Sequence, residues 1–464
     1  MLFVLLAATF LRLHDLADIP PGVTHDEADH GVDAWGVVNG IRPLYFTVGY
    51  GREPLYDYST AILMAVLGPT YLAGRITAVF FGLVLIAGRS AWARLVVKRR
   101  VALLAAAGLA VGFWPLMVSR HALRTITMPA LFVLAACWFW LGIRPALQEK
   151  QPSVPPFIVA GLFLGATFYT YIPARLMWML FPALLFYLLL VARPVFKRSW
   201  RGTLLMLGIA FIVGLPLFLY LLRNPAAEVR LDQLAYPLTA ILEGDWAPLW
   251  ANIKSGLPVL FFQGDPQWRY NIAGRPFLTL PMALLFVVGL IVAIVRIFRP
   301  ASPDKYKQDL RRPTGMVLAV VWLVLGLAPV LVTGSDLSTT QGIGLLPVLY
   351  LFPALALVSG FDWWHERTGR RVARWGWVAV VVLFGWLAVE TIQAYFITWA
   401  NRPEVRTHYE TTLVSAMRYL NENGQGPVAV SSLTPNRFHD PATAQMTLAN
   451  DAVDLRWFNG QSSL

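Results

Sequence analysis

Residues 1–30 read MLFVLLAATFLRLHDLADIPPGVTHDEADH, an apolar run followed by a loop rich in acidic side chains and histidines. The run from Leu2 to Leu13 has no basic leader and no small-residue cleavage site, so it reads as a membrane span or the end of one. Carboxylates are costly to keep near lipid, and Asp26 and Glu27 directly after such a run therefore indicate a functional site. The other reading is that they are ordinary acids that cap a helix or line a wet loop.

The composition is typical of a polytopic helical membrane protein. Hydrophobic residues make up 57% of the 464 residues and charged residues only 14%, against about 25% charged in soluble domains. The net charge of +12 does not indicate nucleic acid, because the basic residues cluster in short loops between apolar runs, as the positive-inside rule expects. The single cysteine, Cys137, excludes an intramolecular disulfide.

Basic connectors and apolar runs together predict the membrane topology. After the first run, the predicted spans are residues 72–95, 101–119, 125–143, 156–172, 175–192, 203–222, 277–297, 314–333, 343–361 and 375–397. The basic connectors assigned to the cytoplasm are residues 94–100, 144–150, 193–201, 296–312 and 367–374.

Residues 54–68 are also apolar, but they are short for a span and contain Asp57, so we expect a helix on or dipping into the outer surface. We therefore expect an integral plasma-membrane protein with eleven spans. Its N-terminus lies in the cytoplasm, and its C-terminus and the loop carrying Asp26 lie outside.

The chain is expected to have two parts. Residues 1–397 form the transmembrane body, and residues 398–464 form an extracytoplasmic tail. Within the tail, residues 405–420 read as an amphipathic helix, and residues 427–431 and 454–458 as short strands. Such a small α/β segment cannot bury a core alone. We expect it either to dock on the body or to begin a longer soluble domain, and the short first run leaves the natural start open as well.

Basic side chains on the outer side run against the charge bias and are candidates for binding phosphate. Arg120 and Arg124 lie four residues apart, so they share a face if the segment is helical. The guanidinium group matches phosphate oxygens. Arg175 and Arg52 are further candidates at the outer edge. Alternatively, these side chains snorkel to lipid headgroups, and Arg175 with its aromatic neighbours belongs to an interfacial belt.

Other polar residues could support the same site. Glu53 is either a site carboxylate, a metal ligand, or a first-turn acid favoured by the helix dipole. His25 and His30 flank the carboxylates, although five residues is poor spacing for a zinc site on one helix face. In the predicted loop 223–276, Gly264-Asp265 and the stretch from Arg269 to Pro276 are polar and turn-rich, which fits a surface loop or a lid over the site. The sequence contains no P-loop, dinucleotide fingerprint or serine-elbow motif, which argues against ATP-driven transport.

Taken together, these motifs resemble those of the polyprenyl-phosphate-dependent glycosyltransferases of the GT-C fold. The resemblance is strongest to bacterial members of the protein O-mannosyltransferase and aminoarabinose-transferase superfamily. The Asp26–Glu27 pair is the most specific element. The segments that carry the resemblance are Arg12-Leu13 leading to Pro20-Pro21-Gly22, Asp26 to Ala28, Gly51 to Leu55, Leu72 to Arg75, Ser119 to Arg124, and Tyr169 to Arg175.

The resemblance implies an all-α membrane glycosyltransferase with a polyprenyl-phosphate sugar donor and a protein, glycan or lipid acceptor. It implies that Asp26 is the catalytic base, that Glu27 supports it, and that outer basic residues hold the lipid phosphate. A single displacement would invert the anomeric carbon. The sequence indicates no definite cofactor. Whether the enzyme needs a divalent cation is left open, because Glu27 and Glu53 could be either metal ligands or hydrogen-bond partners.

Two departures from the family pattern matter. Some relatives carry a basic residue where this chain has Glu53, and some carry a second acid where it reads Arg124-Thr125-Ile126-Thr127. We therefore expect phosphate binding to fall on Arg120, Arg124 and Arg175.

Three alternatives remain: a lipid-linked glycan transporter, a non-catalytic membrane assembly partner, and, within the family, an oligosaccharide transferase or polymer ligase. Inverted repeats and broken helices in mid-membrane, which transporters often have, are not evident in the sequence.

Overall fold

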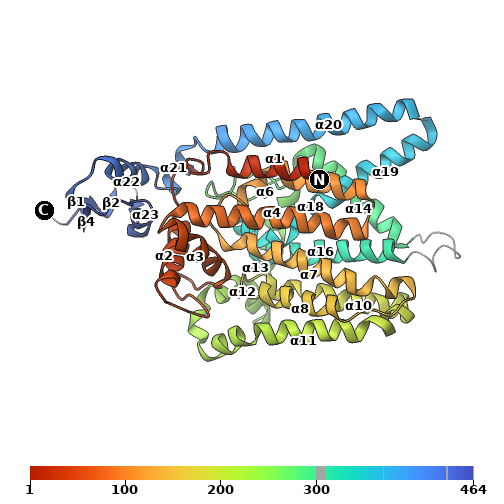
Figure 1. Ribbon diagram of the computed structural model, residues 1–464. Helices are drawn as coiled ribbons and strands as arrows, with labels where there is room; N and C mark the ends of the chain where they lie inside the picture. The colour runs from red at the N-terminus through yellow and green to blue at the C-terminus, as the bar shows by residue number, and fades with distance from the viewer. Residues whose placement is uncertain (299–309, 369, 435–436, 463–464) are drawn as a thin grey trace.

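The computed structural model describes residues 1–298, 310–368, 370–434 and 437–462. The basic connectors predicted at residues 296–312 and 367–374 lie partly outside this range. The described chain forms a bundle of long helices that run side by side, with a small α/β tail beyond one end of the bundle (Figure 1).

Eight helical segments of the described chain are long and apolar enough to cross a membrane. They coincide with eight of the predicted spans. Four of them are single helices: α4 (Tyr71–Val96), α11 (Arg193–Arg223), α14 (Leu280–Phe298) and α16 (Arg311–Thr333). The other four are the segments 124–148, which contains α7 (Thr127–Ile143); 174–191, with α9 (Ala174–Met177) and α10 (Leu180–Val191); 335–367, with α17 (Ser338–Gln341), α18 (Leu346–Leu349) and most of α19 (Leu351–Thr368); and 375–399, which begins within α20 (Arg370–Ile392).

The predicted count of eleven spans is not confirmed. The other three fall on shorter helices, which are α1 (Leu2–Leu13), α5 (Arg99–Val111) followed by α6 (Phe113–Val118), and α8 (Pro155–Thr167). The predicted span 101–119 is interrupted at Gly112. Pro115 has no amide hydrogen to bond the carbonyl of Val111 and cannot continue α5. The Tyr350 hydroxyl also occupies the space that a side chain at position 112 would need.

Small residues allow the helices to pack closely. On α8, a Cβ atom at Gly161 would lie 2.6 Å from the backbone oxygen of Met206, and one at Gly165 would lie 2.5 Å from Val213, both on α11. On α14, a Cβ at Gly289 would meet the backbone of Phe352 in α19. Close backbone approach of this kind is the usual way in which helices associate in lipid.

The end of the bundle nearest the tail carries the irregular parts of the chain. Here α2 (His25–Val38) packs against α3 (Leu55–Leu67) (Figure 1). The helix α3 exposes Ile62 and Val66 while it buries Tyr56 and Met64, an amphipathic pattern. Two further helices, α12 (Val229–Leu242) and α13 (Ala247–Gly256), lie in the connection between α11 and α14.

The tail begins after α20 and folds back onto α2. Its elements are α21 (Pro403–His408), α22 (Thr411–Asn423), β1 (Gly426–Ser431), β2 (Leu433–Thr434), β3 (Arg437–Phe438), α23 (Pro441–Gln445) and β4 (Val453–Phe458). Strands β1 and β4 pair in parallel, from Gly426 opposite Val453 to Ser431 opposite Phe458, and β2 pairs antiparallel with β3. The predicted helix 405–420 is two helices, because Glu410 adopts a left-handed conformation (φ 45°).

Two hydrogen bonds to or from the backbone join the tail to the residues just before α2. The Val23 amide donates to the Tyr409 carbonyl at 2.7 Å, and the Thr411 hydroxyl donates to the Pro21 carbonyl. Gly22 lies between them with φ of 132°. The tail therefore contacts the loop that leads into α2, just before the Asp26–Glu27 pair.

Candidate functional site

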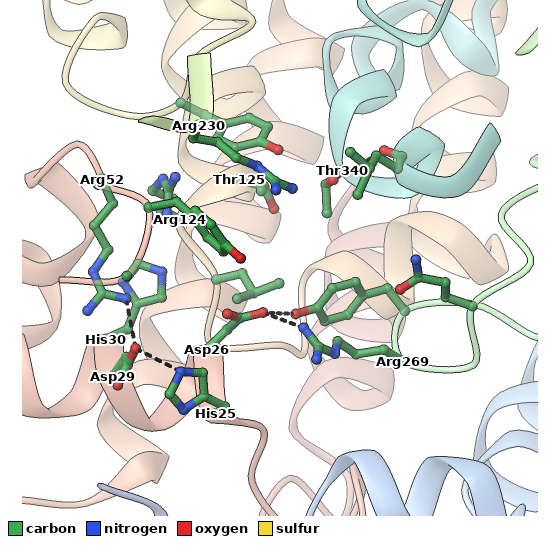
Figure 2. A pocket seen from close by; sticks show the side chains of 18 of the residues that line it. His25, Asp26, Asp29, His30, Arg52, Arg124, Thr125, Arg230, Arg269 and Thr340 are labelled. Atoms are coloured by element: carbon green, nitrogen blue, oxygen red, sulfur yellow. Dashed lines mark hydrogen bonds and ion pairs between the residues drawn. The ribbon is translucent and has the colours of Figure 1, made fainter. Parts of the chain in front are cut away.

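A cavity of about 270 Å³ lies at this end of the bundle. Its walls come from segments far apart in sequence: the first turns of α2, residues 48–52, residues 123–125, residues 265–270 and residues 336–340, with Tyr171 and Arg230 (Figure 2). Carboxylate and guanidinium groups dominate the side chains that Figure 2 labels around it.

The start of α2 places Asp26 and Glu27 in different surroundings. The Thr24 hydroxyl accepts a hydrogen bond from the Glu27 amide at 3.2 Å, and the Glu27 carboxylate accepts one from the Thr24 amide at 3.1 Å. This reciprocal pair is a capping box, which fixes the first turn of a helix. In that turn Asp26 lines the cavity, whereas Glu27 is 1% exposed and does not line it.

Asp26 is held by the loop that follows α13. Arg269 donates to Oδ2 of Asp26 at 2.9 Å, and the Tyr270 hydroxyl donates to the same oxygen at 2.6 Å (Figure 2). Burial raises the pKa of Asp26, but the Arg269 charge and the Tyr270 hydrogen bond outweigh it and hold the pKa below its usual value. The carboxylate is therefore ionised at neutral pH, and its side chain is 41% exposed.

Glu27 joins three parts of the chain within the protein interior. It forms an ion pair with Arg75 of α4 at 3.2 Å and accepts the Ala122 amide at 2.9 Å. Arg75 is itself fully buried and also donates to the Leu16 and Pro20 carbonyls. This arrangement gives Glu27 a structural role beneath the cavity.

Two of the four arginines predicted to bind phosphate line the cavity, and two arginines that were not predicted line it as well. Arg124 lines the cavity with Nε 3.2 Å from Oε2 of Glu53, and Arg52 lines it while donating to Asp33 at 2.5 Å. Arg230 lies over the Tyr50 ring with 5.6 Å between the guanidinium carbon and the ring centroid. With Arg269, these make four guanidinium groups that line the cavity together with the carboxylates of Asp26, Asp29, Asp265 and Asp336.

The structure does not bring Arg120 into the cavity. The premise that Arg120 and Arg124 share a helix face is wrong, because α6 ends at Val118 and helix resumes only at η1 (Arg124–Ile126). Arg120 is fully buried and donates to the carbonyls of Leu11, Arg12 and Ile19 at 2.7 to 2.9 Å.

Arg175 lies beside a second, apolar space. It lines a groove of about 300 Å³ together with Trp178 and Phe211. Its guanidinium pairs with Glu228 at 2.5 Å and with Glu53 at 3.5 Å. Because Glu53 also pairs with Arg124, this buried carboxylate connects the groove to the cavity.

The remaining predicted residues have defined partners. Glu53 precedes α3 and is fully buried between two arginines, so it is not an exposed first-turn acid. His30 is buried with Nδ1 2.5 Å from Asp57, and burial holds its pKa well below the usual value. Nδ1 of His25 lies 2.7 Å from Oδ2 of Asp440, a residue of the tail.

Several charged and polar residues at or beside the cavity were missed as site residues, among them Asp29, Asp265, Asp336, Arg230, Arg269, Tyr270 and Asp440. The stretch containing Arg269 and Tyr270 was recognised as a surface loop or a lid, and the structure brings it against Asp26. Its turn-rich polarity was the available signal. Arg230 on α12 and Asp440 in the tail carry no local signal, because their positions depend on contacts across the chain.

Comparisons with known proteins agree with this architecture. Residues 51–236 match the family model described as dolichyl-phosphate-mannose-protein mannosyltransferase. A comparison with curated protein sequences finds no match.

Solved structures with a similar fold include AglB and ArnT. One is the archaeal oligosaccharyltransferase AglB from Archaeoglobus fulgidus, in complex with an inhibitory peptide and a dolichol-phosphate. It is 15% identical with a TM-score of 0.53, and the match covers 91% of this chain but only 58% of AglB. The other is ArnT from Cupriavidus metallidurans bound to undecaprenyl phosphate, which is 14% identical with a TM-score of 0.52 over 96% of this chain and 84% of ArnT. The chain thus has the GT-C fold, and its residues 51–236 carry the sequence pattern of the protein mannosyltransferase family.

Proposed function

We propose that the chain is a membrane glycosyltransferase that moves a sugar from a polyprenyl-phosphate donor to an acceptor hydroxyl group on the extracytoplasmic side. The observation that carries the proposal is a partly exposed, ionised Asp26 in a cavity lined by four arginines. The dolichol-phosphate bound by AglB and the undecaprenyl phosphate bound by ArnT support a lipid-phosphate donor. The basic connectors between the apolar runs support placing Asp26 on the extracytoplasmic side of the membrane.

Asp26 acts as the general base. Both of its hydrogen bonds within the described chain go to Oδ2, which leaves Oδ1 to accept the proton of the acceptor hydroxyl. The hydroxyl oxygen forms a bond to the anomeric carbon as its proton passes to Asp26. Arg269 and Tyr270 orient the carboxylate for this step and keep it ionised until the acceptor arrives.

Arginines stabilise the leaving group. As the bond between the anomeric carbon and the phosphate oxygen breaks, its electron pair stays on that oxygen. Guanidinium groups held in a partly dry cavity stabilise the negative charge that develops there. We assign this role to Arg124, Arg52 and Arg230 in place of Arg120 and Arg175. A single displacement of this kind inverts the anomeric carbon.

The apolar groove beside Arg175 suits the hydrocarbon chain of the donor. Its walls include Trp178, Phe211 and Phe218, and they come from the end of α8, from α9 and its C-terminal end, and from α11. Because Glu53 links Arg175 to Arg124, a lipid in the groove would place its phosphate toward the cavity.

Transfer of radiolabelled sugar from polyprenyl-phosphate sugars to membrane acceptors tests the proposal in purified protein. We expect transfer by the wild type and its loss in Asp26→Asn. Asp454→Asn is the matched control, since Asp454 is an exposed tail residue paired only with Arg456 in the described chain, and it should transfer normally. Transfer that survives in Asp26→Asn removes Asp26 as the base. Absence of transfer with every donor favours a transporter or an assembly partner.

A further inference from the structure

A cluster of three potential metal ligands lies at the rim of the cavity and is not used by the proposed reaction. His25 and Asp29 are one helical turn apart on α2, so their side chains share a face. Asp440 reaches them from the tail, where its other carboxylate oxygen caps α23 by accepting the Ala442 amide at 3.0 Å. One ligand atom from each residue lies within 4.8 Å of the others.

The three side chains are close enough to bind one ion with small movements. Nδ1 of His25 lies 2.7 Å from Oδ2 of Asp440, and its Nε2 lies 3.4 Å from Oδ2 of Asp29. The two contacts use different nitrogens of the ring, and one ion binds only one of them. One ligand atom from each residue lies within 4.8 Å of the others, so small side-chain rotations bring them to the separation of about 3.3 Å expected on a tetrahedral zinc ion with bonds of ~2.0 Å. His25 is 54% exposed, so its ring has room to turn when its contact with Asp440 is replaced by a bond to metal, whereas both aspartates are 15% exposed and more firmly placed.

The local charge balance favours a cation at this position. Asp26 is neutralised by Arg269, and Asp33 is neutralised by Arg52 at 2.5 Å. Asp29 has Arg52 only at 3.8 Å, and the one side-chain base within 4.0 Å of Asp440 in the described chain is His25. Two carboxylates thus share one imidazole, and the only further guanidinium within 4.0 Å in the described chain is the more distant Arg52 beside Asp29.

We propose that His25, Asp29 and Asp440 bind one divalent transition-metal ion, with Zn²⁺ preferred. One imidazole and two carboxylates form a ligand set that suits zinc among the metals available to proteins. Because two ligands belong to α2 and the third to the tail, the ion fixes the tail against the helix that carries Asp26. The proposal does not depend on the transfer reaction, since metal binding is measured directly.

Zinc binding by the full-length, tag-free protein in detergent tests the proposal. The chelator-treated protein is titrated with Zn²⁺ alone, and bound metal is counted by elemental analysis. We expect one zinc per chain, and we expect Asp440→Asn and His25→Gln each to weaken binding at least tenfold. The matched controls are Asp454→Asn and His439→Gln, which lie in the tail outside the cluster and should bind as the wild type does.

Limited proteolysis provides a second measurement. Zinc should slow cleavage between the body and the tail in the wild type and in both control variants, and it should have no effect on Asp440→Asn. Equal elution volumes and unfolding temperatures of the metal-free proteins show that the variants are folded. Stoichiometric binding that survives in both Asp440→Asn and His25→Gln overturns the proposal, as does the absence of zinc binding by the wild type at about 100 μM.

Discussion

Replacing Glu27 by glutamine tests whether this buried residue stabilises the fold or takes part in the transfer reaction. Glu27 accepts hydrogen bonds from the Thr24 amide, from two nitrogens of Arg75 and from the Ala122 amide, all at 2.9 to 3.2 Å and without solvent. Glutamine has the same size but only one acceptor oxygen. Its NH₂ group would face a donor, and Arg75 would keep a buried charge with only carbonyl partners.

Breaking a buried ion pair by removing one partner costs about 3–5 kcal/mol. This corresponds to a change in the unfolding equilibrium of about 100-fold to 4,000-fold. We expect Glu27→Gln to show that loss in denaturant unfolding within detergent micelles, followed by tryptophan fluorescence. We also expect the fraction that remains folded to transfer sugar at close to the wild-type rate, because Glu27 does not line the cavity.

Two comparisons sharpen this experiment. Asp26→Asn should change the free energy of unfolding by no more than about 1 kcal/mol, because its ion pair is partly exposed, yet it should abolish transfer. The double variant Glu27→Gln/Arg75→Gln should lose less stability than the sum of the two single variants, as expected for a contacting pair. If Glu27→Gln unfolds like the wild type and transfers nothing, then Glu27 takes part in the chemistry and the reasoning is refuted.

Three further outcomes are expected. Tyr270→Phe removes one of two bonds that orient Asp26 and should lower kcat about tenfold with little change in the donor KM; an unchanged kcat would contradict the orienting role. Arg124→Ala removes a cavity guanidinium and should lower kcat/KM about 10-fold to 100-fold, whereas Arg175→Ala should mainly raise the donor KM; equal effects on kcat would argue against the division between cavity and groove. Gly22→Ala would place a Cβ atom 2.1 Å from the Tyr409 carbonyl oxygen, so it should make the tail more sensitive to protease. Gly40 has a φ of 101° but open space around it, so Gly40→Ala is the control for backbone strain alone.

Most of the membrane body could be predicted from the sequence, because lipid imposes long apolar runs that leave a direct pattern. Eight of the eleven predicted spans correspond to long apolar helices. The break at Gly112 could have been anticipated from Pro115, since proline cannot bond the carbonyl four residues earlier. The capping box of Thr24 and Glu27 was also visible in the sequence spacing, and it favours the structural reading of Glu27.

The site was only partly predictable, since its residues meet through contacts that are distant in sequence. Asp26 could be found from its place after an apolar run, but its partners Arg269 and Tyr270 come more than 240 residues later. Arg120 and Arg124 are close in sequence but differ in direction, because α6 ends at Val118 and helix resumes only at Arg124. One of them is consequently locked onto backbone carbonyls while the other lines the cavity.

The contacts between the beginning and the end of the chain also bear on how the protein is made. A chain that enters the membrane during synthesis presents its N-terminal part first, at roughly 5–20 residues per second. The loop carrying Asp26 would then wait for residue 269 to emerge before its carboxylate gains a partner, and for residue 409 before Val23 is bonded. The residues that line the cavity, from His25 to Thr340, are thus all made before the tail, but the chain entering α2 gains its bond to Tyr409 only when the tail has emerged. A ribosome-bound or truncated product that stops before the tail would carry the cavity residues in the membrane without that bond.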